Sequence, residues 1–133
     1  MWQTPKTDWK SSDYFNLNPD YLRIKGNIEA LKELGGELYP TFSLKAMGDY
    51  TIEDIPDVDF FNTVEENVEL LGQKTYWPVG YQQRQVYKEN GRAWSHEDLN
   101  RLERNLQLLY TALKSQKEGC RALCFELGGG QLG

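Results

Sequence analysis

The sequence predicts a mainly α-helical protein with three amphipathic helices. Three runs of apolar residues recur at alternating spacings of three and four, which is the periodicity of one face of a helix. Long stretches rich in glycine, proline and aromatic residues separate these runs, and we expect them to be loops. We therefore divide the chain into an extended N-terminal arm (1–17), a three-helix domain (18–119) and a C-terminal strand or arm with a glycine-rich tail (120–133).

Length and composition narrow the protein class. The 133 residues suffice for one domain, and a net charge of −5 argues against a nucleic-acid partner, which would need clustered Lys and Arg. No apolar run approaches the roughly 20 residues that span a bilayer, so we expect no membrane insertion. The first residues lack the apolar stretch of a secretory signal, so we expect synthesis and initial folding in a cytoplasm.

The N-terminal arm combines polar residues with four aromatic ones, Trp2, Trp9, Tyr14 and Phe15. Disordered tails are usually depleted in aromatic residues. We expect these rings to dock either on the helices of their own chain or on a neighbouring subunit.

The first two helices carry ordinary start and stop signals. Asn18 followed by Pro19 predicts an N-cap and first helical position, and Gly35-Gly36 predicts the end of that helix. The second helix is expected from about Pro56 to Gly72. The stretch 73–94 contains Trp77-Pro78, Gly80 and Asn90-Gly91; we expect mostly loop there, with a hairpin through 81–94 as the alternative.

The third helix has the clearest start. Ser95 and Asp98 are spaced for a reciprocal capping box, and Gly119 predicts a left-handed C-terminal stop. After it, residues 121–127 are expected to form either a strand or an extended arm, followed by a flexible Gly128-Gly129-Gly130 end. Cys120 and Cys124 would then face one side of the strand as small apolar groups, with thiol chemistry as the alternative.

The three helices are predicted to be copies of a degenerate repeat. The residues Tyr21, Ile24, Asn27, Ile28 and Leu31 correspond to Phe61, Val64, Asn67, Val68 and Leu71 at a distance of 40 and to Leu99, Leu102, Asn105, Leu106 and Leu109 at a distance of 78. Apolar matches alone are common to amphipathic helices. The recurring asparagine is more specific, because asparagine is a poor helix former that prefers to bond to backbone. We predict that Asn27, Asn67 and Asn105 each hold an incoming segment of the chain; solvated asparagines are the alternative.

Catalytic or metal chemistry is not predicted. His96 is the only histidine, and at a helix start it is more often a capping or surface residue than a base. The acids Glu53, Asp54, Asp57 and Asp59 lack the ligand loop of a calcium site and suit the N-terminal end of a helix dipole. Two cysteines with one histidine do not complete a zinc site. We expect no enzyme activity and no cofactor.

The aromatic residues outside the helices point to an interface. Three helices cannot cover all of them, and Trp and Tyr are enriched where subunits meet. We predict Trp2, Trp9, Trp77 and Tyr81 as interface residues of a homo-oligomer within a larger assembly.

Several segments carry a resemblance to a known family. They are Trp2-Gln3-Thr4-Pro5-Lys6-Thr7-Asp8-Trp9, Asp13-Tyr14-Phe15-Asn16, Asp20-Tyr21-Leu22-Arg23-Ile24-Lys25-Gly26-Asn27-Ile28, and Asn90-Gly91 followed by Asp98-Leu99-Asn100-Arg101-Leu102-Glu103-Arg104-Asn105. Together they resemble tail-associated or minor structural proteins of phages and prophages of Gram-positive bacteria, over roughly residues 2–113. Leu22 and Gly26 stand where that pattern has asparagine. The resemblance implies a virion component of the tail or its tip, without catalysis, whose partners are other tail proteins. It also implies that the protein is made in the cytoplasm of a bacterial host.

Two other functions remain open from the sequence. The chain could be a binding module in which Trp77, Tyr81 and their neighbours meet a glycan or protein of the host surface. It could also be an intracellular regulator that packs on partner helices. Assembly into large oligomers would favour the structural role. A monomer that retains cell-wall polysaccharide would favour the binding module, and a monomer that captures a host cytoplasmic protein would favour the regulator.

Overall fold

Three α-helices make up most of the structure, a computed structural model that describes residues 2–48, 58–88 and 94–126, with side chains up to 119. The helices are α1 (Leu22–Leu38), α2 (Val58–Lys74) and α3 (His96–Glu126), and a π-helical segment (Leu17–Tyr21) leads into α1. Within those ranges the chain forms no strand, so the expected mainly helical class is confirmed.

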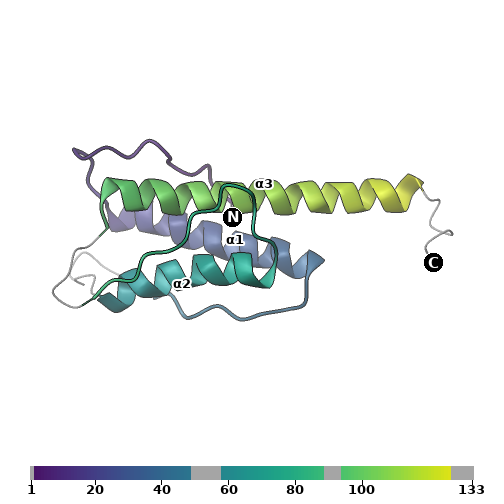
Figure 1. Ribbon diagram of the computed structural model, residues 1–133, viewed down its shortest axis with the longest axis horizontal. Helices are drawn as coiled ribbons and strands as arrows, with labels where there is room; N and C mark the ends of the chain where they lie inside the picture. Colours follow the sequence, from purple (N-terminus) through teal and green to yellow (C-terminus); the bar gives the residue numbers. More distant parts are fainter. Residues whose placement is uncertain (1, 49–57, 89–93, 127–133) are drawn as a thin grey trace.

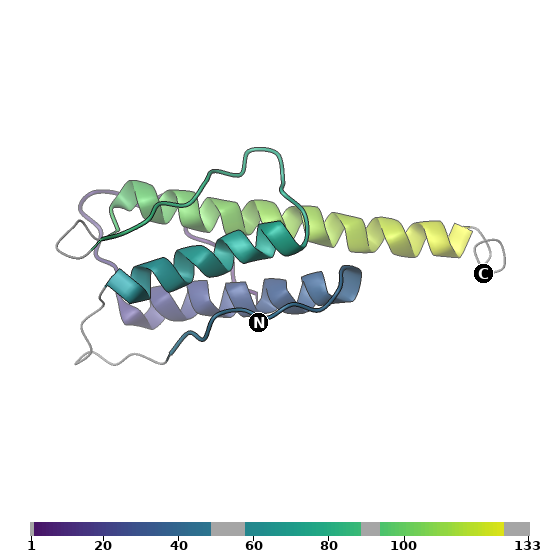
Figure 2. The same cartoon turned by 60° about the horizontal axis from the view of Figure 1, so that its bottom comes forward.

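The three helices run in the same direction, and extended segments return along them. Figures 1 and 2 show each helix starting at the same end of the bundle and an extended segment leading back before the next helix begins. All three helix pairs are in contact. Two of the described return segments, 39–48 and 75–88, and the N-terminal arm are therefore available to cover grooves between helices.

The core lies where the three apolar stripes meet. It is buried because the stripe residues of each helix point toward the other two. Its members are Ile24, Ile28 and Leu31 of α1, Phe60, Val64, Val68 and Leu71 of α2, and Leu99, Leu102, Leu106, Leu109 and Leu113 of α3, joined by Tyr21, Trp9 and Phe42. Two of these, Trp9 and Phe42, come from the extended segments, so the segments complete the core.

The start of α1 differs from the prediction. Tyr21 is at the N-cap position of α1 and Asn16 at that of the π-helical segment, so Asn18 is not an N-cap. Asn18 lies inside the π-helical segment, where its backbone is extended (φ −129°, ψ 117°) and its bond to Pro19 is cis. Instead, the Asn16 N–H donates to Asp20 Oδ2 at 2.9 Å, and the Tyr21 N–H donates to the Asn16 carbonyl at 3.0 Å. The carboxylate of Asp20 thus closes a wider first turn.

The start of α3 agrees with the prediction. The Ser95 N–H donates to Asp98 Oδ2 at 3.0 Å, and the Asp98 N–H donates back to Ser95 Oγ at 3.2 Å. This reciprocal pair satisfies N–H groups that a helix start otherwise leaves unpaired.

The predicted glycine stops are wrong, for two different reasons. Gly35 and Gly72 lie inside α1 and α2 because other chain segments pack against them: a Cβ at Gly35 would lie 2.7 Å from Thr75 Cγ2, and one at Gly72 would meet the Trp77 ring. Gly119 faces open space, and α3 continues through it to Glu126. No proline follows Gly119, and an exposed helical glycine costs only about 1 kcal/mol. Residues 121–126 are therefore helical, where we expected a strand or extended arm.

Helix α3 extends well beyond the other two. It has 31 residues against 17 in each of α1 and α2, and Figures 1 and 2 both show its C-terminal part projecting from the bundle. In the described part of the chain, no helix is long and apolar enough to cross a membrane.

Several predictions fall outside what is described. These are the helix start near Pro56, the turn at Asn90-Gly91, the glycine tail 128–130, and the side chains of Cys120 and Cys124. In the described part of the 73–94 stretch, residues 75–88 form a loop with one hydrogen-bonded turn at Pro78–Tyr81 and no hairpin.

Candidate functional site

Each of the three repeated asparagines binds the backbone of one residue in an extended segment. Asn27 Oδ1 accepts the Gln3 N–H at 2.7 Å, and its Nδ2 donates to the Gln3 carbonyl at 2.8 Å. Asn67 binds Lys45 in the same way at 2.8 and 2.9 Å, and Asn105 binds Gln82 at 3.0 and 2.7 Å. We call this two-bond contact an asparagine clamp.

The clamp partner always precedes the helix of its asparagine. The separations are 24, 22 and 23 residues along the chain. Each helix therefore holds the extended segment that leads into it. The three asparagine side chains are almost completely buried, which makes their amide groups costly to leave unpaired.

Two further clamps were not predicted. Asn62 of α2 binds both backbone groups of Tyr87 at 2.8 and 2.9 Å, and Asn100 of α3 binds those of Trp9 at 2.7 and 3.0 Å. Both asparagines lie five residues before a predicted one, so the spacing was present in the sequence. The equivalent position in α1 is Leu22, which has no amide group and is exposed.

The clamps place each segment over a groove between two helices. The N-terminal arm is held by Asn27 of α1 and Asn100 of α3, and segment 75–88 is held by Asn105 of α3 and Asn62 of α2. Segment 39–48 is held by Asn67 of α2, and its Gly48 carbonyl accepts the Tyr21 hydroxyl of the π-helical segment before α1 at 2.7 Å. Each of the three grooves is therefore covered by one extended segment, two of them through two clamps and the third through one clamp and the Tyr21 hydroxyl.

A buried carboxylate organises the groove between α1 and α3. Glu103 has no exposed surface, and it accepts the Nε and Nη2 groups of Arg23, both at 2.8 Å. It also accepts the indole N–H of Trp9 at 2.6 Å and the backbone N–H of Lys6 at 3.0 Å. Four donors therefore surround one carboxylate, which offsets the cost of removing its charge from water.

A second carboxylate has the same role between α2 and α3. Glu65 is 1% exposed and pairs with the guanidinium of Arg101 at 2.8 and 2.5 Å. It also accepts the Tyr87 hydroxyl at 2.9 Å and the Trp94 indole N–H at 3.2 Å. The equivalent positions in the groove between α1 and α2 do not hold such a pair. By the repeat spacing, Thr63 of α2 stands at the position of the arginine and Lys25 of α1 at that of the glutamate.

The pKa values reflect these pairs. Hydrogen bonds from Arg23 to Glu103 are the main cause of a raised pKa for that guanidinium. Burial opposes the charge of Arg101, but its hydrogen bonds to Glu65 and the Glu65 charge outweigh that effect and raise its pKa. Burial, followed by the charge of Glu65, raises the pKa of Tyr87, so its phenol stays protonated as a donor. We call Glu103 and Glu65, each with its set of donors, the two carboxylate hubs. Each hub joins two helices and one extended segment.

The four aromatic residues predicted at an interface lie in different settings. Trp9 is buried in its own core, which is incompatible with a role in a subunit interface in this conformation. Trp2 stacks on Tyr110 of α3, with ring centroids 4.1 Å apart and planes 6° from parallel. Trp77 and Tyr81 pack edge to face with centroids 4.7 Å apart, and Trp77 remains 47% exposed.

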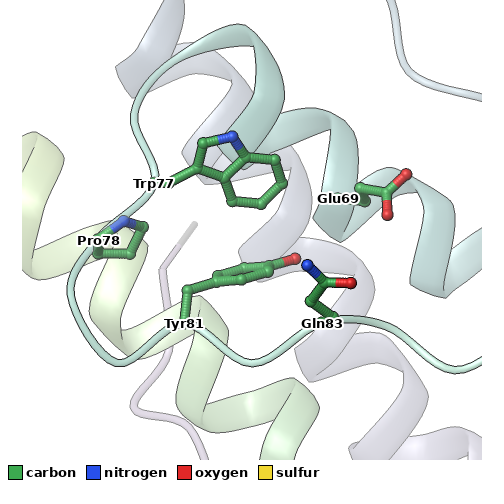
Figure 3. A pocket seen from close by; sticks show the side chains of 5 residues that line it. All are labelled: Glu69, Trp77, Pro78, Tyr81 and Gln83. Carbon is green, nitrogen blue, oxygen red and sulfur yellow. The ribbon is translucent and has the colours of Figure 1, made fainter.

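A surface hollow of about 340 Å³ lies at this last pair. It is lined by Glu69 of α2 and by Trp77, Pro78, Tyr81 and Gln83 of the following loop. Figure 3 shows the hydroxyl of Tyr81 directed toward the side of Gln83 and Glu69, while the indole nitrogen of Trp77 points away from Tyr81. The hollow therefore joins an apolar ring surface to a polar edge.

Other residues considered for chemistry are not brought together. His96 is at the first position of α3 and has Glu97 at 4.0 Å as its charged neighbour. Of the four acids Glu53, Asp54, Asp57 and Asp59, only Asp59, in the first turn of α2, is among the described residues. No group of three or more metal-binding side chains occurs in the part of the chain that the structure describes.

Comparisons with known proteins found no match: no family model fits the chain, and neither a curated protein nor a solved structure is similar to it. The candidate sites therefore rest on the geometry given above.

Proposed function

We propose that this protein is a non-enzymatic structural component of a phage tail, tail tip or baseplate, located in the virion, where it acts through contacts with copies of itself and with other tail proteins. The observation that carries the proposal is that the buried polar side chains hold the protein's own chain in place. The five clamps and the two carboxylate hubs bind the chain's own segments and do not converge on a shared cavity.

The exposed surface suits protein contacts. Large apolar side chains stand out on the extended segments and loops, among them Tyr14, Tyr76, Trp77, Val79 and Val86. Three of them, Tyr76, Trp77 and Val79, lie within four residues of one loop. Exposed apolar side chains that cluster are typical of surfaces that a partner covers. Such segments, fixed by clamps, present these side chains in a defined geometry.

The equivalent clamps also support the proposal that the three helices form a degenerate repeat. In this interpretation, one unit is an extended segment followed by its helix, and each segment is held by its own helix and by one other. Three units close into a ring, which explains why a small bundle can order long segments without strands.

Particle composition tests the proposal. Phage particles would be induced from the bacterium that carries the gene, purified on a density gradient and analysed by mass spectrometry, followed by immunogold labelling. We expect the protein to purify with the major tail protein and the label to lie on the tail. Recovery of the protein only in the particle-free fraction, together with abundant host cytoplasmic proteins, would refute a virion role.

The oligomeric state gives an independent measurement. Light scattering of the purified protein at micromolar concentration should give a mass that is a multiple of 15.4 kDa. A strictly monomeric protein that is nevertheless present in particles would limit the proposal to contacts with other tail proteins.

A further inference from the structure

We propose that the hollow lined by Glu69, Trp77, Pro78, Tyr81 and Gln83 binds one ring of a neutral saccharide. The ring would lie with its C–H face on Trp77 and with its hydroxyl groups toward Tyr81, Gln83 and Glu69. This binding function goes beyond the structural role, and either one can hold without the other.

Contacts within the chain hold the aromatic wall of the hollow in place. Gly72 of α2 leaves room for the indole, because a Cβ at that position would lie within 2.5 Å of Trp77 Cε3. The Tyr81 N–H donates to the Pro78 carbonyl at 3.1 Å, and Gly80 has φ +93°, as a type II turn requires at its third residue. This turn brings Tyr81 edge-on to Trp77, which fixes the pair that a sugar face would meet.

An asparagine clamp holds the other side of the hollow. Asn105 binds both backbone groups of Gln82. In an extended chain, residues two apart point to the same side. Tyr81 and Gln83, which flank Gln82, therefore both face the hollow, as Figure 3 shows. A site whose side chains are already positioned loses less entropy on binding.

The polar groups at the edge of the hollow differ from the hydrogen-bonded indole groups that lie between the helices. Trp9 and Trp94 both donate their indole N–H groups to buried carboxylates. Among the described residues, by contrast, neither the Tyr81 hydroxyl nor the Gln83 side-chain amide has a hydrogen-bond partner. Both groups can donate and accept, which matches sugar hydroxyls.

Size and charge select the ligand class. A volume of about 340 Å³ is at the lower end of the range for small-molecule pockets and suits a single ring better than an extended peptide. The charge of Glu69 is offset by Arg84, whose Nε lies 3.3 Å from Glu69 Oε2. With a net charge of −5, the protein as a whole would repel anionic polymers. A neutral sugar ring, with one apolar face and several hydroxyls, fits all three features.

Chemical-shift mapping by NMR on the ¹⁵N-labelled full chain tests the proposal. Glucose, galactose, mannose, rhamnose, N-acetylglucosamine and N-acetylgalactosamine would each be titrated to about 50 mM, because single-ring binding is expected to be in the millimolar range. We expect at least one sugar to shift the Trp77 indole N–H and the Gln83 side-chain amide, while the Trp9 indole N–H remains unchanged. No shift with any of the six sugars would overturn the proposal.

Three variants sharpen the result. Trp77→Ala should weaken binding at least about tenfold, and Gln83→Ala, at an exposed side chain, about threefold or more while keeping the fold. Tyr14→Ala removes an aromatic ring that is 85% exposed on another segment and should not alter affinity. Binding that survives both Trp77→Ala and Gln83→Ala, or shifts of these resonances with a proline-rich peptide but with no sugar, would show that the hollow is not a saccharide site.

Discussion

Replacing the clamp asparagines by alanine tests whether these contacts stabilise the fold. Asn105→Ala removes two hydrogen bonds and leaves the N–H and carbonyl of Gln82 without their protein partner. At about 0.5–1.5 kcal/mol per hydrogen bond, the free energy of unfolding should fall by about 2 kcal/mol. With an unfolding entropy of about 2.1 cal/mol/K per residue, the thermal midpoint of a chain of this length should fall by about 7 °C.

Thermal and urea unfolding followed by circular dichroism give these values, and hydrogen exchange shows where the effect arises. In Asn105→Ala, the Gln82 amide should exchange much faster, while the Gln3 and Lys45 amides, held by other clamps, should keep their protection. Asn27→Ala should likewise speed exchange of the Gln3 amide, and Asn67→Ala that of the Lys45 amide. Gln107→Ala on the same helix is the control, since its side chain makes only an exposed bond to Thr111.

A loss of less than about 0.5 kcal/mol in all three alanine variants, the usual size for a surface substitution, would show that the clamps do not stabilise the fold. Unchanged exchange at Gln82 in Asn105→Ala would show that Asn105 does not hold its segment. A loss of stability without local exchange would mean that the asparagines matter for helix packing and not for holding the segments.

Three other substitutions test the hubs, the glycine contacts and a titrating group. Arg101→Ala leaves buried Glu65 without its cation and should cost about 3–5 kcal/mol in urea unfolding, whereas Lys45→Ala, which breaks the exposed pair with Glu66, should cost under about 1 kcal/mol. Gly72→Ala forces a methyl group against the Trp77 ring and should lower the thermal midpoint, whereas Gly36→Ala, with nothing within 4 Å, should raise it slightly; equal effects would contradict the close approach. The raised pKa of Tyr87 means that its contribution to stability is complete below its ordinary value of 10.0 and is lost as pH rises above it. Between about pH 9 and pH 11, Tyr87→Phe should therefore lose less stability than the wild-type protein, and identical losses would exclude this titration.

Local patterns in the sequence were sufficient to locate the three helices and the start of α3, but not the other helix ends. The leucine spacing and the Ser95–Asp98 pair depend on residues within one or two turns, and both are as expected in the structure. The stop predicted at Gly72 was wrong because this glycine makes room for a residue of the next loop, Trp77, whose position no helix signal encodes.

The clamps could likewise be predicted only in part, the asparagines from the sequence and their partners only from the structure. An asparagine beside a core position indicates an unusual buried amide, so Asn27, Asn67 and Asn105 could be selected from the sequence. Their partners are 22 to 24 residues away, and nothing in the residue type of Gln3, Lys45 or Gln82 marks them, because the clamp binds only backbone. Trp9 shows the same limit, since its bond to Glu103 spans 94 residues.

Buried polar contacts also determine how the helices are aligned along one another, which the apolar stripes do not. A stripe with a spacing of three and four repeats about every seven residues, so sliding one helix along another by two turns would still bury apolar side chains. Such a slip would separate Arg101 from Glu65 and would move Asn105 from Gln82, leaving buried charges and amides unpaired at a cost of several kcal/mol. The two Arg–Glu pairs and the five clamps can form in only one alignment of the helices and segments. They therefore fix the register of parallel helices and the path of each segment, and we infer that their main contribution is to specify a single arrangement.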